Sequence, residues 1–472
     1  MLSVQYLSIT FLAKRKGIGE VKWRTTNNTQ HTTATLYKKK KKKMKNNAMI
    51  SQNIIETIPL LHKSSSKKRM REMYMVQKDA YAEEEWKNIL SHCTLRPIVN
   101  GERKKSMEYP CYSESEDFYC FPREYGKKQF GNEFSDERCE GETISADAEF
   151  TATLYPYQKK CVDWVCRRLR KSSSAAIYAD CGMGKTCMAI ACAVNMGVKT
   201  CILCNSGPIL NQWIESLERF TQNLSVGKVQ AKTREIDNKD VVVCMVQSVF
   251  NKSFLPNDKF GLIVWDEAHH LSCKTFLATL GMFCAQYLLC LTATPSRSDG
   301  LAYLMDWAVS PVSYNLRRTN INMEVQVVEV EHENRSEIRM WNGKINYSAM
   351  LTRLVNFPKR TQAIVTKIKD LKKEHPESRI LVLSSRKKLL AEAIQNFDQK
   401  EAMMYIGCTR KKDVEVRDAR ARDKSVKLVF ATTNIAAEGL DLKPPPSILV
   451  LMTPCKSILT QAIGRVTREE EG

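Results

Sequence analysis

The sequence lacks several features that would assign it to a special class of protein. No uninterrupted apolar stretch reaches the ~18 residues expected of a membrane-spanning helix. Residues 1–12 are only weakly apolar and have no basic segment before them, which argues against a secretory signal. The 17 cysteines have no disulfide-framework spacing, and several lie inside apolar runs. We therefore expect a protein with reduced thiols in an intracellular setting and without a membrane partner.

A repeated Cys-x-x-Cys pair, which many structural zinc sites use, is also missing. Cys201 and Cys204 have that spacing once, but they lie in the apolar run 200–204. Residues i and i+3 of a strand point to opposite faces, so the two thiols cannot share one ligand. We expect both to be packed core cysteines.

Positive charge is abundant but unevenly distributed. The formal net charge is +21, and residues 1–72 hold 17 Lys and Arg against three Glu, a net charge of +14. Six of these lysines are consecutive, at 38–43. The composition predicts a disordered basic tail over residues 1–76. Four interpretations stay open: a nuclear address, a sequence-independent phosphate-binding arm, a passive solvated tail, or translated leader ahead of a start at Met44 or Met49.

Residues 77–150 show no clear hydrophobic periodicity. Aromatic residues and glycines recur within 121–131. We expect this part to be an ordered, loop-rich preface to the next domain rather than a separate catalytic domain.

From residue 151 onward, apolar runs of strand length alternate with helical patterns, which predicts βαβ units and parallel sheets. With 472 residues and 43% hydrophobic content, the chain can bury two or three cores. We predict α/β domains at 151–310 and 357–472, joined by a linker or insertion at 311–356. The expected strands are 175–179, 200–204, 241–246, 262–265 and 287–291 in the first domain, and 380–383, 403–406, 427–430 and 448–451 in the second.

The strongest chemical signal is a glycine-rich loop behind the first of these strands. Residues 179–186 read Ala-Asp-Cys-Gly-Met-Gly-Lys-Thr. Gly182 and Gly184 have no Cβ, which lets backbone N–H groups approach phosphate oxygens closely. We expect Lys185 to reach the β- and γ-phosphates of a nucleoside triphosphate and Thr186 to bind Mg²⁺. The run that follows suits a helix whose N-terminus faces the phosphates.

An acidic pair follows another expected strand. The apolar run 262–265 leads into Asp-Glu-Ala-His at 266–269. This places both carboxylates at the carboxyl end of a parallel strand, where ligands of open α/β sheets bind. We expect Asp266 to hold Mg²⁺ through water and Glu267 to orient or polarise the attacking water. Asp-Glu is also common at helix N-termini, so the pair alone does not identify a magnesium site. The glycine-rich loop is what favours that interpretation.

The second domain contains two arginines at helical spacing. Arg465 and Arg468 would fall about one turn apart on one face of a helix. Guanidiniums so placed can clamp a transferring γ-phosphate, an effect worth about 10³ to 10⁵ in turnover. Arginines at this spacing are more often a solvated helix face, so both interpretations stay open for this segment alone.

The order of these motifs resembles that of superfamily 2 helicases over about residues 154–468. In the first domain the similar segments are 154–158, 179–186 (motif I), 205–213 (motif Ia), 266–269 (motif II, the DEAH box) and 292–295 (motif III). In the second domain they are 384–385 (motif IV), 432–441 (motif V) and 461–468 (motif VI).

This resemblance implies an α/β fold of two tandem RecA-like parallel-sheet domains with a nucleotide cleft between them, and an ATP hydrolase that uses Mg²⁺. It implies that Gln158 recognises adenine. The other implied nucleotide-binding residues are Gly182, Met183, Gly184, Lys185, Thr186, Gly439 and Asp441. The implied catalytic residues are Asp266, Glu267, Gln461, Arg465 and Arg468.

The resemblance also implies residues that couple ATP to movement along a strand. Thr292 and Thr294 would sense the γ-phosphate, although a tight turn before Pro295 is an alternative role. The candidates for holding strand phosphates are Ser206, Gln247, Ser248, Ser385 and Thr432. Such contacts give no sequence preference, and ordinary strand-end capping is the alternative role of the hydroxyl residues among them.

Residues 291–301 resemble the XPB type and the transcription-associated helicases of large DNA viruses such as poxviruses and iridoviruses. The preface segment 121–131 is similar to the segment before the motor in some of those viral proteins. This implies a motor acting on nucleic acid, with DNA favoured over RNA, in transcription or repair. Transcription machinery is the expected partner, and the nucleus, a virus factory or a virion is the expected location.

The chain ends four residues after Arg468, whereas the second domain of the family continues into at least one more strand. We therefore expect a truncated C-terminal domain. The alternative functions are a nucleic-acid-binding scaffold with impaired ATP turnover and an RNA helicase. The phosphate-handling residues favour the enzyme over the scaffold.

Overall fold

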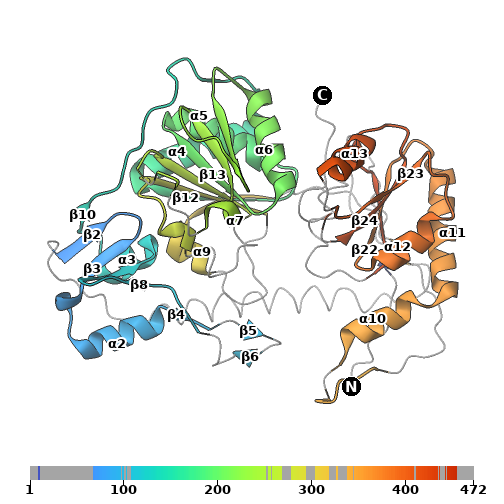
Figure 1. Cartoon of the computed structure of the whole chain (residues 1–472), viewed down its shortest axis with the longest axis horizontal. Helices are drawn as coiled ribbons and strands as arrows, with labels where there is room; N and C mark the ends of the chain where they lie inside the picture. The colour runs from blue at the N-terminus through green and yellow to red at the C-terminus, as the bar shows by residue number, and fades with distance from the viewer. Residues whose placement is uncertain are drawn as a thin grey trace. The chain divides into compact units, whose positions relative to one another are not determined.

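The computed structural model describes residues 9–10, 67–96, 98–99, 102–103, 108–250, 254–256, 258–267, 278–293, 303–317, 326–327, 337–343, 345–408, 411–433, 435, 442 and 444–453. The chain divides into two compact units, which are labelled in Figure 1. One unit comprises residues 34–317, and the other comprises residues 1–33 together with 318–472. No helix among the described residues is long and apolar enough to span a bilayer.

An eight-stranded sheet forms the centre of the first unit, in the order β16-β15-β17-β13-β18-β19-β12-β20. All neighbouring strands run parallel except β15 and β16. The five strands predicted for this domain are confirmed, whereas β15, β16 and β20 were not predicted. The bounds are β12 Ser174–Ala179, β13 Thr200–Cys204, β15 Val226–Gln230, β16 Thr233–Arg234, β17 Val241–Met245, β18 Leu262–Asp266, β19 Tyr287–Thr292 and β20 Ser313–Leu316.

Both faces of this sheet are buried, as its continuous apolar runs predict. Along β18, Val264 packs into a core shared with α4, α5 and α6, whereas Ile263 packs into a second core on the other face. Cys201 and Cys204 of β13 divide between the two cores in the same way, so the predicted core packing of these cysteines is confirmed. The helices are α4 Pro156–Ser172, α5 Lys185–Met196, α6 Gly207–Phe220, α7 Val246–Val249 and α9 Tyr303–Ala308.

The preface is a small α/β layer that packs against the second face of the large sheet. Its five-stranded sheet has the order β10-β2-β3-β9-β8, and its aromatic residues Tyr74, Trp86, Phe121 and Phe130 belong to the same core as Ile263. The bounds are β2 Lys68–Met70, β3 Tyr74–Gln77, η2 Lys78–Ala80, α2 Glu83–His92, β8 Ser113–Glu114, β9 Phe118–Phe121, α3 Arg123–Phe130 and β10 Ser135–Asp136.

The position of β2 corrects the predicted boundary of the basic tail. Residues 68–76 were assigned to a disordered tail ending at 76, but β2 and most of β3 lie there. Lys68, part of the basic cluster at 67–71, is buried and donates from Nζ to the carbonyl oxygen of Phe130 at 2.7 Å. Its ammonium group therefore stabilises the preface and is not part of a solvated basic surface.

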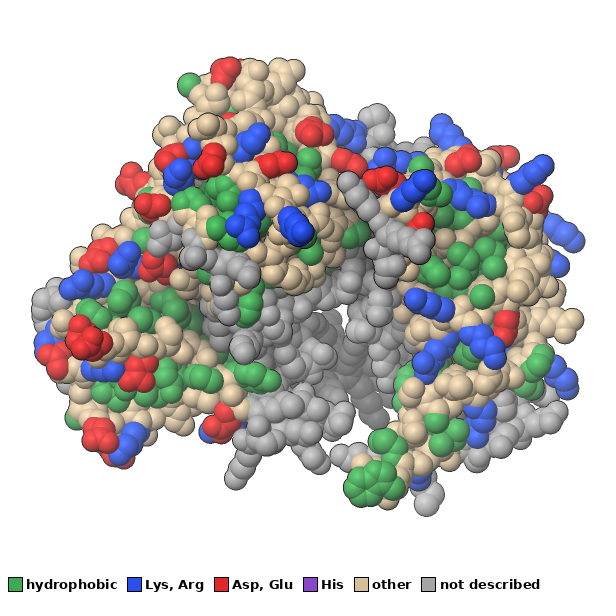
Figure 2. Space-filling model, viewed as in Figure 1, with side chains coloured by type: hydrophobic (Ala, Val, Ile, Leu, Met, Phe, Trp, Pro, Cys, Tyr) green, Lys and Arg blue, Asp and Glu red, His purple; other side chains and the backbone are tan. Residues whose placement is uncertain are grey.

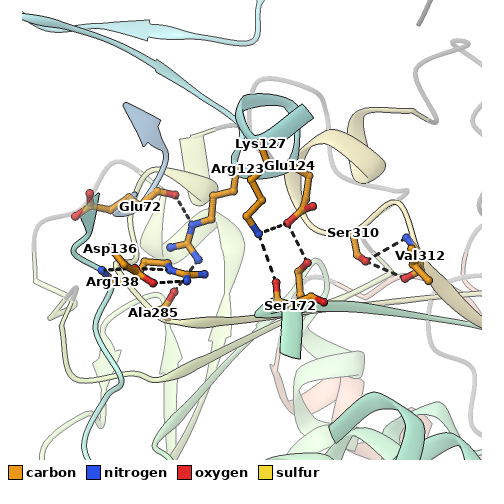
Figure 3. A network of polar contacts seen from close by, with 11 residues as sticks. Glu72, Arg123, Glu124, Lys127, Asp136, Arg138, Ser172, Ala285, Ser310 and Val312 are labelled. Carbon is orange, nitrogen blue, oxygen red and sulfur yellow. Dashed lines mark hydrogen bonds and ion pairs between the residues drawn. The ribbon is translucent and has the colours of Figure 1, made fainter. Parts of the chain in front are cut away.

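Arg123, at the start of α3, ties the preface to the large sheet (Figure 3). Its guanidinium is buried and donates to the carbonyl oxygens of Glu72 at 3.1 Å, Ala285 at 2.8 Å and Phe283 at 3.3 Å. Burial and the nearby Arg138 lower the pKa of Arg123 to about 9. Three acceptors from two segments thus meet on one cation, one segment 51 residues before Arg123 and the other about 160 residues after it.

The second unit is built on a four-stranded parallel sheet with the order β23-β24-β22-β25. Val382 and Leu381 of β22 pack into different cores on its two faces, so this sheet is also covered on both sides. The four strands predicted for this domain are confirmed. The bounds are β22 Ile380–Ser384, β23 Ala402–Tyr405, β24 Leu428–Thr432, β25 Ile448–Leu451, α10 Tyr347–Val355, α11 Pro358–Glu374, α12 Lys387–Ile394 and α13 Lys411–Ala421.

Parts of the predicted linker 311–356 belong to the two units. Strand β20 joins the edge of the first sheet beside β12, and Val355 of α10 lies in a core of the second unit. The predicted α/β class with two RecA-like parallel-sheet domains is confirmed. Short pairs complete the described structure: β1 Ile9–Thr10 with β21 Gln326–Val327, β4 Thr94–Leu95 with β7 Tyr109–Pro110, β5 Ile98–Val99 with β6 Glu102–Arg103, and β11 Glu149–Phe150 with β14 Thr221–Gln222.

Candidate functional site

The glycine-rich loop and the acidic pair meet at the carboxyl edge of the eight-stranded sheet. Strand β12 ends at Ala179, immediately before the loop, and β18 ends at Asp266. The two strands are separated only by β19, which ends at Thr292. This is the edge at which parallel α/β sheets bind ligands.

The loop has the backbone shape that its two glycines predict. Gly182 and Gly184 have φ angles of 77° and 78°, in the left-handed region that favours glycine. Gly184 is the N-cap of α5, and no side chain caps this end of the helix. The first N–H groups of α5 are therefore free of a side-chain cap and suited to donate to an anion such as a phosphate.

Gln158 holds this loop from the side. Its Oε1 accepts a hydrogen bond from the backbone N–H of Tyr155 at 2.9 Å, and its Nε2 donates to the carbonyl oxygen of Met183 at 3.2 Å. A Cβ built on Gly184 would lie 2.3 Å from Nε2 of Gln158. The structure thus places Gln158 and Met183 together at the loop, and adenine recognition by Gln158 stays a prediction.

Lys185 and Thr186 form the first turn of α5. The Lys185 ammonium donates to the carbonyl oxygen of Ala179 at 3.0 Å. Its positive charge also acts to lower the pKa of Asp266. Lys185, expected to bind phosphate, and Asp266, expected to hold magnesium, therefore lie at the same edge of the sheet.

Asp266 is a buried carboxylate with an unfavourable environment for its charge. The pKa of Asp266 is raised to about 6, mainly by burial and to a smaller extent by the negative charge of Glu267. The indole Nε1 of Trp213 donates to Oδ2 of Asp266 at 2.7 Å and partly opposes this shift. A divalent cation would relieve the repulsion, and Mg²⁺ prefers carboxylate and hydroxyl oxygens. Asp266 fits such an ion, and Thr186 stays its predicted second ligand.

Glu267 has a backbone conformation that is rare for its residue type. Its φ angle is 47°, in the left-handed region. Strained residues of this kind often occur at functional sites, where the surrounding fold holds them in place. The conformation turns the chain directly after β18.

The candidates for strand binding lie at the carboxyl ends of other strands. In the first unit, Ser206 is the N-cap of α6. Gln247 of α7 donates from Nε2 to the carbonyl oxygen of Asn205 at 3.1 Å, and Oγ of Ser248 accepts from the N–H of Ala231 at 2.9 Å. Ser248 thus caps the turn between β15 and β16, and its part in strand binding stays a prediction.

In the second unit, Ser385 directly follows β22, and Thr432 is the last residue of β24. These two strands are parallel neighbours in the sheet. Ser385 is exposed, and its backbone N–H donates to Oγ1 of Thr453 at 2.8 Å. Oγ of the preceding Ser384 accepts from the N–H of Arg386 at 3.0 Å. These bonds hold the loop of the predicted motif IV so that the side chain of Ser385 lies at the surface.

The structure also places Thr292 at the end of β19, fully buried. Six predicted site residues lie outside the described residues, and their roles stay predictions. They are Thr294, Gly439, Asp441, Gln461, Arg465 and Arg468.

Two contacts at the site were not predicted. One is the indole donor of Trp213, for which the only sequence signal is a tryptophan on the apolar face of a helix. The other is an ion pair of 2.8 Å between Asp180 in the loop and Arg317, which follows β20. No local pattern connects residues so far apart in sequence.

Two family models and several viral proteins match this chain. A family model described as the res subunit of type III restriction enzymes matches residues 151–297, and a model described as the conserved C-terminal domain of helicases matches residues 361–470. A protein of Acanthamoeba polyphaga mimivirus, provisionally named an ATP-dependent RNA helicase, is 27% identical over 416 residues, which cover 84% of this chain and 78% of the relative.

More distant relatives extend the same comparison. A protein of Invertebrate iridescent virus 6, provisionally named a helicase, is 24% identical over 64% of this chain and 71% of its own length. A solved structure of S. cerevisiae Dbp5 bound to RNA and ADP BeF3 is 14% identical, covers 67% of this chain and 85% of that chain, and has a TM-score of 0.46. The resemblance to viral helicases predicted from the motifs is confirmed by the viral relatives and the two family models.

Proposed function

We propose that this chain, which has both helicase domain types and resembles the helicases of large DNA viruses, is a superfamily 2 motor of the DEAH type. It hydrolyses ATP with Mg²⁺ and uses the energy to move along a nucleic-acid strand. Transcription or repair is the setting that its motifs favour.

One observation carries the proposal: a buried carboxylate and a lysine lie together at the mouth of a phosphate-binding loop. Lys185 donates to the carbonyl oxygen of Ala179 at the end of β12, and Asp266 ends β18, two strands along the same edge of the sheet. A buried acid next to a second acid is costly unless a cation binds there. A metal–triphosphate complex brings both the cation for Asp266 and the anion for Lys185.

Each residue then has a definite task. The N-terminus of α5 and Lys185 bind the phosphates, Asp266 and Thr186 hold the metal, and Glu267 orients the attacking water. Bound Mg²⁺ supplies charge neutralisation on the phosphate oxygens. Trp213 keeps the carboxylate of Asp266 in one orientation through its indole N–H.

DNA is the proposed strand, with RNA as the second candidate. The resemblance of residues 291–301 to transcription-associated viral helicases favours DNA. The mimivirus relative is named as an RNA helicase, which favours RNA. The candidate contacts Ser206, Gln247 and Ser385 offer hydroxyl and amide groups, which bind backbone phosphates of either nucleic acid.

The central test is ATP hydrolysis by the full chain, with and without single-stranded DNA or RNA. We expect nucleic acid to stimulate hydrolysis, and Lys185→Ala and Glu267→Gln to abolish the stimulated activity. Lys171→Ala is a matched control, because it removes an exposed lysine at the end of α4 in the same unit. Hydrolysis that stays flat at every nucleic-acid concentration would instead support the scaffold.

A second test concerns the arginines of the predicted motif VI. Arg468→Ala should reduce turnover far more than it weakens ATP binding, because a γ-phosphate clamp acts mainly in the transition state. Equal losses in both quantities would argue against the clamp. Strand displacement on matched DNA and RNA duplexes with overhangs at either end would identify the substrate and the polarity.

A further inference from the structure

The second unit presents an apolar surface that the proposed ATP site does not use. Four large hydrophobic side chains close together in sequence are exposed: Met340, Trp341, Ile345 and Tyr347. Trp341 has 98% of its surface exposed. Figure 2 shows hydrophobic side chains gathered at the end of this unit near α10. Exposed aromatic clusters of this kind commonly mark an interaction site.

A closed turn holds the indole of Trp341 away from the core. The N–H of Gly343 donates to the carbonyl oxygen of Met340 at 2.9 Å, and Arg339 forms an antiparallel bridge with Ile345. The guanidinium of Arg339 also donates to the carbonyl oxygen of Gly343 at 2.8 Å. Gly343 has a φ angle of 75°, which favours glycine here. We refer to residues 339–343 and 345 as the Trp341 turn.

The Trp341 turn is joined to α10. The N–H of Asn346 donates to the carbonyl oxygen of Ile338 at 2.7 Å, at the base of the turn. Oδ1 of the same Asn346 accepts from the N–H of Ala349 at 3.0 Å and so caps α10. The orientation of the turn is therefore set by the first turn of this helix.

The start of α10 is bonded in turn to the loop of the predicted motif IV. Arg386, the residue after Ser385, donates from its guanidinium to the carbonyl oxygen of Ser348 at 3.1 Å and to its Oγ at 2.9 Å. A chain of hydrogen bonds thus connects Ser385, proposed to hold a strand phosphate, with the turn that presents Trp341.

The charge of this region is suited to a polyanion. Residues 338–369 contain seven Lys and Arg, of which Arg360 is buried, and no Asp or Glu, and Asp370 follows directly. Glu337, just outside this segment, pairs with Arg339. Among neighbouring side chains, Lys387 and Lys388 at the start of α12 are exposed. An exposed indole within a basic segment has the two features of a single-strand binding surface, a stacking platform and positive charge.

We propose that the Trp341 turn is a base-stacking element, in which the indole stacks on an unpaired base of the strand whose backbone binds at Ser385. The inference rests on the proposed function, because it takes nucleic acid as the ligand of this unit. Every base has an aromatic face, so the contact is independent of sequence. Tyr347, the first residue of α10, is also exposed.

The test compares Trp341→Ala, Trp341→Phe and the wild-type chain in binding of labelled single-stranded oligonucleotides by fluorescence anisotropy. We expect Trp341→Ala to weaken binding about fivefold or more, the lower end of the contribution of one base–aromatic stack. Trp341→Phe should keep most of the affinity. Val416→Ala is the matched control, because it truncates another exposed apolar side chain of the same unit.

An abasic oligonucleotide of equal length separates stacking from other effects. With this strand, the wild-type chain and Trp341→Ala should bind equally, because no base remains to stack. Basal ATP hydrolysis without nucleic acid and the thermal unfolding midpoint should be the same in all variants.

Two outcomes overturn the proposal while leaving the proposed function intact: equal binding of base-containing strands by the wild-type chain and Trp341→Ala, or an equal loss with abasic strands. The first would assign the exposed indole to a protein partner. If the wild-type chain shows neither strand binding nor stimulated hydrolysis, the proposed function fails and this inference with it.

Discussion

Among the charged side chains that the first unit buries, Asp266 and Arg123 differ in what surrounds them. Asp266 lies at the carboxyl edge of the large sheet, with Trp213 as its side-chain hydrogen-bond donor and Glu267 as a repelling neighbour. Arg123 lies between the preface and the sheet, and three backbone carbonyl oxygens accept its hydrogen bonds. Burial disfavours the charge of both, raising the pKa of Asp266 and lowering that of Arg123.

The difference lies in what compensates the cost of burial. The partners of Arg123 are fixed parts of the backbone, so its charge is stabilised as soon as the protein folds. The partners of Asp266 offset the effects of burial and of the Glu267 charge only in part. Its carboxylate would be fully stabilised only by a bound cation. We infer that Arg123 serves the fold and that Asp266 serves binding, at some cost to the stability of the protein without ligand.

Asp266→Asn is the sharpest test of this contrast, because it should reduce activity and raise stability. We expect loss of ATP hydrolysis by about 100-fold or more, since even residues that only support metal ligands contribute 10- to 100-fold. Without Mg²⁺ at pH 7.5, the variant should unfold at a higher temperature than the wild-type chain.

The sign follows from the pKa of Asp266, which rises from 3.8 to about 6 on folding. The folded state holds its proton more tightly than the unfolded state, so wild-type stability falls as pH rises from about 4 to about 6. Asparagine removes this dependence, and thermal unfolding across that pH range measures it. A variant that is both inactive and less stable would show that Asp266 is a structural residue.

Arg123→Met should have the opposite signature, with lower stability and intact chemistry. The substitution leaves three buried carbonyl oxygens without their donor, and we expect a loss of roughly 3 kcal/mol or more. Urea unfolding measures the change. Hydrolysis by the remaining folded protein should be normal, because Arg123 contacts the segment before β19 and the ATP site lies at the far end of that strand.

The matched control is Arg96→Met. Arg96 pairs with Glu108 at 2.8 Å, and both side chains are nearly half exposed, so its loss should cost less than about 1 kcal/mol. If the folded fraction of Arg123→Met hydrolyses ATP more slowly than the same amount of folded wild-type protein, the preface has a direct part in the reaction.

The same two residues show what the sequence can predict. The sequence predicts Asp266 as a site residue because it follows an apolar run of strand length and belongs to a local motif. Arg123 was not found, because its acceptors are backbone carbonyls, which have no sequence signature. The preface strands were missed for a related reason: they are two to four residues long, too short for periodicity to be recognised.

Within the candidate ATP site, the residues of the local motif could be predicted from the sequence, whereas contacts between residues far apart in sequence could not. Lys185 and Thr186 follow from the motif, and the structure places them at the start of α5. The bond from Trp213 to Asp266 joins residues 53 positions apart, and only the fold brings them together. Strand β20 was assigned to a linker because a four-residue edge strand is too short to stand out.

Two glycines in the left-handed conformation, Gly184 and Gly197, differ in the same way: one lies at the candidate site and the other does not. Gly184 and Gly197 lie at opposite ends of α5, with φ angles of 78° and 71°. Alanine at either position should cost about 1–2 kcal/mol of stability. Only at Gly184 would the new Cβ meet Gln158, whereas nothing lies within 4 Å at Gly197.

We therefore expect Gly184→Ala to displace Gln158 from Met183 and weaken ATP binding about tenfold, and Gly197→Ala to leave ATP binding unchanged. Titration with a fluorescent ATP analogue measures both. Equal effects of the two substitutions would mean that the loop tolerates displacement of Gln158 and that its contact with Met183 does not shape the site.

Trp213→Phe is expected to have the smallest effect, a shift in pH dependence. The indole N–H lowers the pKa of Asp266, so its removal should raise that pKa by about one unit. Asp266 must be ionised to hold Mg²⁺, so the acid limb of the kcat/KM profile should move to higher pH by the same amount. Trp265→Phe is the control, because Trp265 is equally buried but donates to Thr279 at 3.3 Å and not to Asp266. A shift in both variants would point to looser packing, and a shift in neither would show that the cation alone sets the charge of Asp266.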